Sequence, residues 1–260
     1  MRRNGRRREL YRHGRSCGRR SPLQTSDLTP SGPSWGPGSR GVWYAVGPLP
    51  NIDVVQLLTG ILVLLCSLTV HEAAHAWAAD RLGDSTARML GRLSLNPAVH
   101  IDPIGTILFP LIAVATHLPL IGWAKPVPVN TAELGSNWRQ KFMVIAAAGP
   151  ASNLVLATMV AILRRVPVPV AVGAEGGAAS LSSALETAIF VNVLLAVFNL
   201  VPVPPLDGGN VLSGLLTGPM AGTFDRLRPY GFLILYGLML TGMLTTIVWP
   251  PASLLLSWLL

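Results

Sequence analysis

Two histidines and a glutamate stand together in the segment HEAAHAW, residues 71–77. On a helix, His71 and His75 are four residues apart and share one face, so both imidazoles can bind one metal ion. Glu72 follows the first histidine and could hold a water molecule beside that ion. Two histidines and a carboxylate with an open fourth position are a recurring catalytic zinc arrangement, so we expect one Zn²⁺ ion, although such ligands also suit other divalent metals.

These groups follow an unbroken apolar run, VVQLLTGILVLLCSLTV at 54–70, where a lipid-facing helix should carry no ionisable side chain. Each would cost on the order of 3 kcal/mol if it were unpaired within a membrane. A shared metal ion accounts for all three at once. His100 and His117 stand alone near turn residues or in a Pro-broken segment, and we expect them to be structural.

A third metal ligand is expected from another part of the chain. Asp207, in PPLDGG, ends a second apolar stretch and precedes two glycines that allow close backbone approach. An Asp-Gly pair also suits an ordinary turn. Because acidic side chains near membrane spans are usually functional, we favour a ligand over a turn.

The composition indicates an integral membrane protein. Half of the 260 residues are hydrophobic and only 12% are charged, which is outside the range of ordinary soluble domains. We predict an all-α polytopic bundle of about four to six transmembrane helices. The clear spans lie between Asp53 and Asp80 and at 139–165, 185–204 and 230–248, and an apolar tail at 252–260 is too short to cross alone.

The ligands constrain the topology of these spans. His71, His75 and Asp207 each lie near the C-terminal end of an apolar span, so one metal ion requires the two spans to run in the same direction. Two crossings, 139–165 and 185–204, already satisfy this condition. We therefore predict that the Pro-interrupted apolar segment 104–121 is re-entrant: it enters the membrane and returns.

A short β-hairpin is predicted at the membrane surface within residues 87–103. Leu93 and Leu95 alternate there with polar neighbours, as in a half-buried strand. The edge of such a strand could bind an extended substrate. A plain surface turn is the alternative.

The net positive charge belongs to one end of the chain. Ten of the 20 Lys and Arg residues fall in residues 1–40, and the remainder holds equal numbers of basic and acidic groups, so we expect no nucleic-acid partner. Residues 1–50 are rich in Arg, Gly, Ser and Pro and should be a disordered arm. This arm could bind lipid, be a plain tail, or precede the true start; residues 51–260 form the second predicted domain.

Three motifs together resemble the site-2 protease family of zinc intramembrane peptidases. They are HEAAH inside a membrane span, AGPASN in a central span, and FNLVPVPPLDGG closing the next. The resemblance covers roughly 51–216 and implies a metalloendopeptidase that cleaves the transmembrane segments of other membrane proteins. No PDZ insertion or CBS module is recognisable, so the chain resembles a minimal member.

The resemblance also implies roles for individual residues. His71, His75 and Asp207 correspond to zinc ligands and Glu72 to the catalytic base. Asn199 corresponds to a residue that contacts the substrate or the oxyanion, and Asn153 to a central-helix Asn with a less settled, substrate-related role. Gly149 and Pro150 are expected to interrupt that helix and open space beside the metal ion.

Location and partners follow from the same observations. The expected partners are transmembrane protein substrates and membrane lipid, and self-association into a homo-oligomer stays open. Basic residues cluster on the face where the first span ends, which places the active site toward the cytoplasmic side of a bacterial cell membrane. The alternative is a non-catalytic metal-binding or client-binding membrane protein, either a transporter or a degenerate protease. A transporter should have two related halves, and no internal repeat is visible.

Overall fold

The computed structural model describes residues 54–108, 112, 124–166 and 175–260, which all belong to one compact unit, Trp43–Leu260. Every regular element within these ranges is helical, so the predicted all-α class is confirmed. The arm at 1–50 and His117 lie outside the described residues. The elements are α1 (Val54–Arg81), α2 (Thr86–Met89), η2 (Pro97–Val99), η3 (Pro103–Leu108), α4 (Trp138–Arg164), α5 (Glu175–Asn199), α6 (Asp207–Leu215), α7 (Gly218–Leu227), η4 (Arg228–Tyr230), α8 (Gly231–Leu240) and α9 (Met243–Leu259).

Three helices in the described part of the chain are long and apolar enough to cross a membrane: Val54–Arg81, Trp138–Arg164 and Leu181–Asn199. They match the first three predicted spans. A fourth crossing exists only if the bent pair Gly218–Leu240 and Met243–Leu259 counts as one span. Three spans, or four with that pair, lie at or below the lower end of the predicted number.

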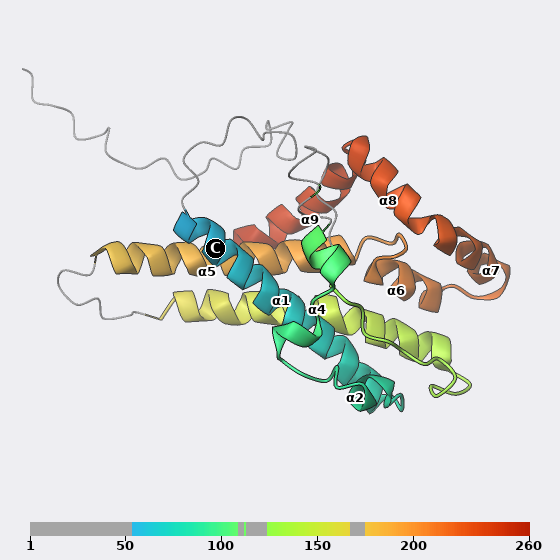
Figure 1. Cartoon of the computed structure of the whole chain (residues 1–260). Helices are drawn as coiled ribbons and strands as arrows, with labels where there is room; N and C mark the ends of the chain where they lie inside the picture. The colour runs from blue at the N-terminus through green and yellow to red at the C-terminus, as the bar shows by residue number, and fades with distance from the viewer. Residues whose placement is uncertain (1–53, 109–111, 113–123, 167–174) are drawn as a thin grey trace, which may run out of the picture. The chain divides into compact units, whose positions relative to one another are not determined.

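Helix α4 is the centre of the bundle and packs against α1, α5 and α6 (Figure 1). Alanines make these approaches close: Ala157 and Ala161 of α4 are buried against Ile189 and Val193 of α5. Small side chains allow helix backbones to come together, and in lipid the resulting van der Waals contact is a main source of helix association. The small residues of α4 therefore allow α5 to pack closely against it.

The fourth predicted span, 230–248, is not one straight helix. Gly242 has a φ of 72°, a left-handed conformation that favours glycine, and the chain bends by 80° at this break. Helix α9 then continues through Pro250 and Pro251 to Leu259. The prediction of a separate tail at 252–260 was wrong because the glycine, and not the proline pair, ends a helix here.

The predicted hairpin within 87–103 is not formed; this described segment contains no strand, only α2, η2, the first residue of η3, and turns, bends and irregular chain. Local side chains satisfy its backbone groups and compete with strand pairing. Asn96 Oδ1 accepts a hydrogen bond from the Ala98 amide at 3.0 Å, and His100 Nε2 lies 2.9 Å from the Ser94 carbonyl oxygen. The Arg92 side chain donates to the Val99 carbonyl. Leu93 and Leu95 therefore lie in a loop held by its own hydrogen bonds, with no strand edge, and the His100 side chain makes one of these bonds.

The predicted re-entrant segment, 104–121, falls mostly outside the described residues. Its first residues belong to η3, which is a π-helix. Asp102 Oδ1 accepts hydrogen bonds from the Ile104 and Gly105 amides at the start of that helix.

The loop between α5 and α6 is packed tightly against α8. At Gly231, the first residue of α8, an added Cβ would lie 2.6 Å from the Pro204 carbonyl carbon and 2.7 Å from the Pro204 Cβ. Because Pro204 lies three residues before Asp207, the position of α8 constrains the loop that carries this carboxylate.

Replacing Gly231 with Ala should destabilise the protein by about 1–3 kcal/mol, the usual effect of forcing a methyl group into a packed interior. Thermal unfolding in detergent, followed by circular dichroism, measures the change. Gly237→Ala is the matched control in the same helix, because nothing lies within 4 Å of its added Cβ, and helix propensity should make it neutral or stabilising. Equal Tm values for the two variants would contradict the proposed close packing.

Candidate metal centre

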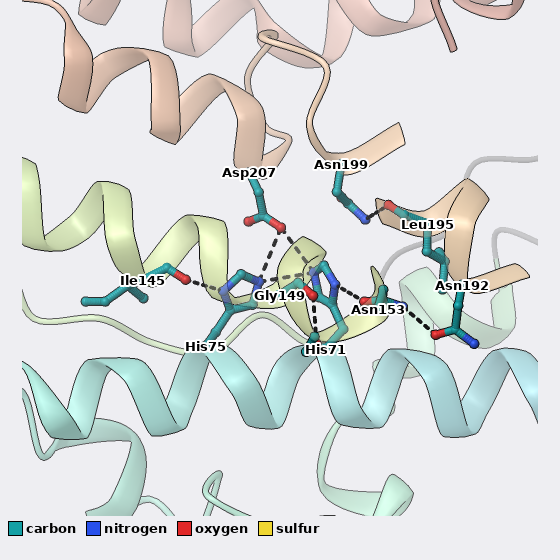
Figure 2. A network of polar contacts seen from close by, with 10 residues as sticks. His71, His75, Ile145, Gly149, Asn153, Asn192, Leu195, Asn199 and Asp207 are labelled. Carbon is teal, nitrogen blue, oxygen red and sulfur yellow. Dashed lines mark hydrogen bonds and ion pairs between the residues drawn. The ribbon is translucent and has the colours of Figure 1, made fainter. Parts of the chain in front are cut away.

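Three side chains converge at one point between α1, α4 and α6 (Figure 2). His71 and His75 rise from successive turns of α1, and Asp207 approaches from the first residue of α6. The two Nε2 atoms lie 3.1 Å apart, and Asp207 Oδ2 lies 3.1 Å from His71 Nε2 and 3.2 Å from His75 Nε2. The sequence predicted these three residues as ligands of one metal ion, and the structure brings their side chains together.

In each imidazole, Nδ1 makes a hydrogen bond on the side away from the convergence point, so Nε2 is the atom that faces it. His75 Nδ1 lies 2.7 Å from the Ile145 carbonyl oxygen, which can only accept a hydrogen bond. His71 Nδ1 lies 2.7 Å from Asn153 Oδ1, the acceptor atom of that amide. Both Nδ1 atoms therefore carry a hydrogen, and each Nε2 faces the other ring and Asp207, where it can offer a lone pair to a metal ion.

Three electron-pair donors thus face one another at close range. Asp207 Oδ2 is buried and has no hydrogen bond, although both imidazoles are near. A single proton could join only one pair of these atoms, whereas a divalent cation would contact all three. Their separations are close to the edge of about 3.3 Å in a tetrahedron with metal–ligand distances of about 2.0 Å. The residues therefore fit a metal ion such as zinc.

Gly149 of α4 provides the space for this convergence. A Cβ added at Gly149 would lie 2.6 Å from His71 Nε2 and closer still to His75 Nε2. The two imidazoles themselves occupy the volume that the missing side chain of Gly149 leaves, so this volume is not open space beside them. The predicted interruption of the helix was also wrong, because α4 continues through Pro150 to Arg164.

Two glycines bring Asp207 within reach of α1. An added Cβ at Gly208 would lie 2.5 Å from the Val201 carbonyl oxygen, and one at Gly209 would lie 2.7 Å from the Pro204 nitrogen. The start of α6 can fold back on the preceding loop only because both positions lack a side chain. The Asp-Gly-Gly sequence thus determines where the carboxylate is presented.

The other predicted site residues have different surroundings. Glu72 follows His71 on α1 and is half-buried. Asn199 lies at the end of α5, and its Nδ2 donates to the Leu195 carbonyl at 2.9 Å (Figure 2). Leu95 lies in the loop after α2 and is 70% exposed, whereas Leu93 in the same loop is less so.

Asn153 is fully buried, and its partners are inside the protein. Its Oδ1 contacts His71, and its Nδ2 donates to Asn192 Oδ1 at 3.0 Å. This position favours support of His71 over the substrate contact that the sequence suggested. Sequence reasoning overlooked Asn192 and Ser67, which continue this contact. The available signals were an amide within an apolar span and a hydroxyl one helical turn before His71.

Comparisons with known proteins agree with these observations. The model of Peptidase family M50 matches residues 164–240. Over 214 residues the chain is 37% identical to a Bacillus subtilis protein named "Putative zinc metalloprotease YwhC", covering 81% of this chain and 90% of that protein. It is 32% identical over 211 residues to "Putative zinc metalloprotease Rip2" of Mycolicibacterium smegmatis, covering 78% and 75%. No solved structure matches the chain significantly.

The chain therefore belongs to the site-2 protease family, Peptidase family M50. The predicted family is confirmed. With its apolar helices, the chain is a membrane protein of a metalloprotease family.

Gly149→Ala should abolish metal binding, because the new methyl group would occupy the space in which the two imidazoles face each other. Elemental analysis of purified protein by mass spectrometry gives the number of metal ions per chain. Gly60→Ala, on α1, is the control and should retain metal, since nothing lies within 4 Å of its added Cβ. Full metal content in the Gly149 variant would show that the ion binds elsewhere.

Proposed function

We propose that this protein is a zinc-dependent intramembrane endopeptidase that hydrolyses peptide bonds in or near the transmembrane segments of other membrane proteins. The observation that carries the proposal is the meeting of two imidazoles from a candidate membrane span, α1, with the carboxylate of Asp207 on α6. His71, His75 and Asp207 would hold the zinc ion. The relatives named as zinc metalloproteases support this assignment.

Glu72 is the proposed catalytic base. When bound, the zinc ion supplies Lewis acidity that acidifies water and polarises a peptide carbonyl. The Glu72 carboxylate accepts a proton from the attacking water as the new C–O bond forms. It then returns this proton to the amine nitrogen as the C–N bond breaks. Its place one residue after His71 keeps it beside the ligands without making it one of them.

Asn199 is proposed to stabilise the negative charge that develops on the carbonyl oxygen of the substrate. An Asn side chain has two N–H donors, and one of them is bound to the Leu195 carbonyl. This bond fixes the orientation of the amide at the end of α5 (Figure 2). The second N–H would donate to the oxyanion, an interaction that is strongest in the transition state.

The proposed substrates are helical before cleavage, which adds a requirement. The hydrogen bonds of a membrane helix protect its backbone from attack, so the substrate must be locally unwound near the site. Residues 51–260 form the proposed protease domain. Membrane lipid surrounds it, and self-association is compatible with this function.

The proposed location is a bacterial cell membrane, in line with the bacterial relatives. Lys141 Nζ donates to the Leu82 carbonyl at 3.1 Å, so the end of α1 and the start of α4 meet at one end of the bundle. Basic residues are frequent there, which supports a cytoplasmic position for this end and for the active site.

Glu72→Gln should retain zinc but lose cleavage by at least about a hundredfold, because general acid–base catalysis typically contributes that much. The measurement is hydrolysis of a reporter transmembrane segment by the full-length protein in liposomes, together with zinc content. Asp207→Ala should lose both zinc and cleavage.

Glu133→Gln is the matched control, since Glu133 is an exposed carboxylate on a loop, and this variant should cleave at the normal rate. Unchanged cleavage by Glu72→Gln would refute the proposed mechanism. Zinc-loaded wild-type protein that cleaves no membrane segment would favour a non-catalytic metal-binding protein.

A further inference from the structure

A chain of hydrogen bonds extends from His71 through three helices. His71 Nδ1 meets Asn153 Oδ1 on α4 at 2.7 Å, and Asn153 Nδ2 donates to Asn192 Oδ1 on α5 at 3.0 Å. Asn192 Nδ2 then donates to Ser67 Oγ on α1 at 2.9 Å and to the Ala188 carbonyl at 2.8 Å. We propose that Asn192 is a positioning residue that acts through Asn153 to fix the ring orientation and tautomer of His71.

The direction of this chain is set at its far end. The Ala188 carbonyl can only accept a hydrogen bond, so it requires the amino group of Asn192 on its side. The Asn192 oxygen must then face Asn153, which turns the amino group of Asn153 toward Asn192 and its oxygen toward His71. An acceptor at His71 requires hydrogen on Nδ1 and leaves the Nε2 lone pair for a metal ion.

The surroundings of Asn192 indicate that its hydrogen bonds do more than hold α5 against α4. Asn192 is 1% exposed, beside the buried Ile189 and Val193, and Asn153 is 0% exposed. A buried amide is costly unless its hydrogen bonds are made, and apolar side chains would pack α5 against α4 equally well. Ser67 alone could not select an orientation, because a hydroxyl both donates and accepts.

The two histidines are supported differently. His75 Nδ1 contacts a backbone carbonyl, that of Ile145, whose direction is fixed by the helix. His71 depends on a side-chain amide that could rotate by half a turn and offer a donor instead. Only His71 therefore needs a second residue to orient its partner, and Asn192 occupies that position.

The inference rests on the proposed metal site, so the experiment measures zinc binding and not cleavage. Asn192→Ser keeps the option of bonding the Ala188 carbonyl from within α5 but is too short to reach Asn153. The zinc dissociation constant of the full-length protein in detergent, measured by competition with a chelator, should rise about tenfold, the lower end for loss of a residue behind a ligand. Thr187→Val, a half-buried change on the same helix that removes a hydroxyl bonded to the Ser183 carbonyl, should leave it unchanged.

A double-mutant cycle separates positioning from general destabilisation. If Asn192 acts through Asn153, the variant Asn153→Leu and the double variant Asn153→Leu/Asn192→Ser should have the same zinc dissociation constant. If the double variant instead binds zinc more weakly than Asn153→Leu, by the factor that Asn192→Ser causes alone, the proposal is overturned. If Asn192→Ser does not fold, Asn192→Leu restores apolar packing and serves in the same cycle.

Imidazole ¹⁵N chemical shifts of the metal-free protein give a second readout. In the wild type, His71 should have the shift of a protonated Nδ1, and in the Asn192 variants this signal should move toward a mixture of tautomers. An unchanged shift with an unchanged dissociation constant would refute the role of Asn192. A wild-type protein that binds no zinc would instead refute the proposed function.

Discussion

The structure depends on one electrostatic requirement: three electron-pair donors that repel one another must stay together in an apolar surrounding. His71, His75 and Asp207 meet within hydrogen-bonding distance, yet both histidine hydrogens point away from the meeting point. A cation shared by all three atoms would remove this repulsion, whereas a single proton could join only one pair of them. The Asn153 amide holds the His71 ring and the Ile145 carbonyl holds the His75 ring in place against that repulsion. The two glycines after Asp207 allow its carboxylate to reach them.

The packing of the helices also holds the three donor side chains in position. Helix α4 contacts the helices that carry all three donors, and its Gly149 leaves the space in which they meet. A side chain at that position would force the histidine rings apart, and a larger residue at Ala157 would move α5 from α4. The small residues of α4 therefore set both the distance between helices and the size of the site.

Much of the site could be predicted from the sequence because its chemistry is local or unusual in its context. The spacing of His71 and His75 fixes a shared helical face, and an acidic Asp207 beside an apolar span calls for a partner. The partners of Asn153 could not be predicted, since they depend on the rotation of α4 against α1 and α5. The prediction of a hairpin at Leu93 and Leu95 was wrong for another reason. It used the alternation of apolar and polar side chains, which does not show where the backbone hydrogen bonds are made. In the structure, side chains of the same loop bond to the Ser94 and Val99 carbonyls.

The order of these residues along the chain has a consequence for biosynthesis. Every group that orients the two imidazoles, from Ser67 to Asn192, precedes Asp207 in the sequence. Since a nascent chain folds from its N-terminal side as it leaves the ribosome, both rings can be held in their final tautomers before the carboxylate has been synthesised. Asp207, the first residue of α6, is the last of the three donors to be synthesised, so the complete donor set can form only after this part of the chain has been made.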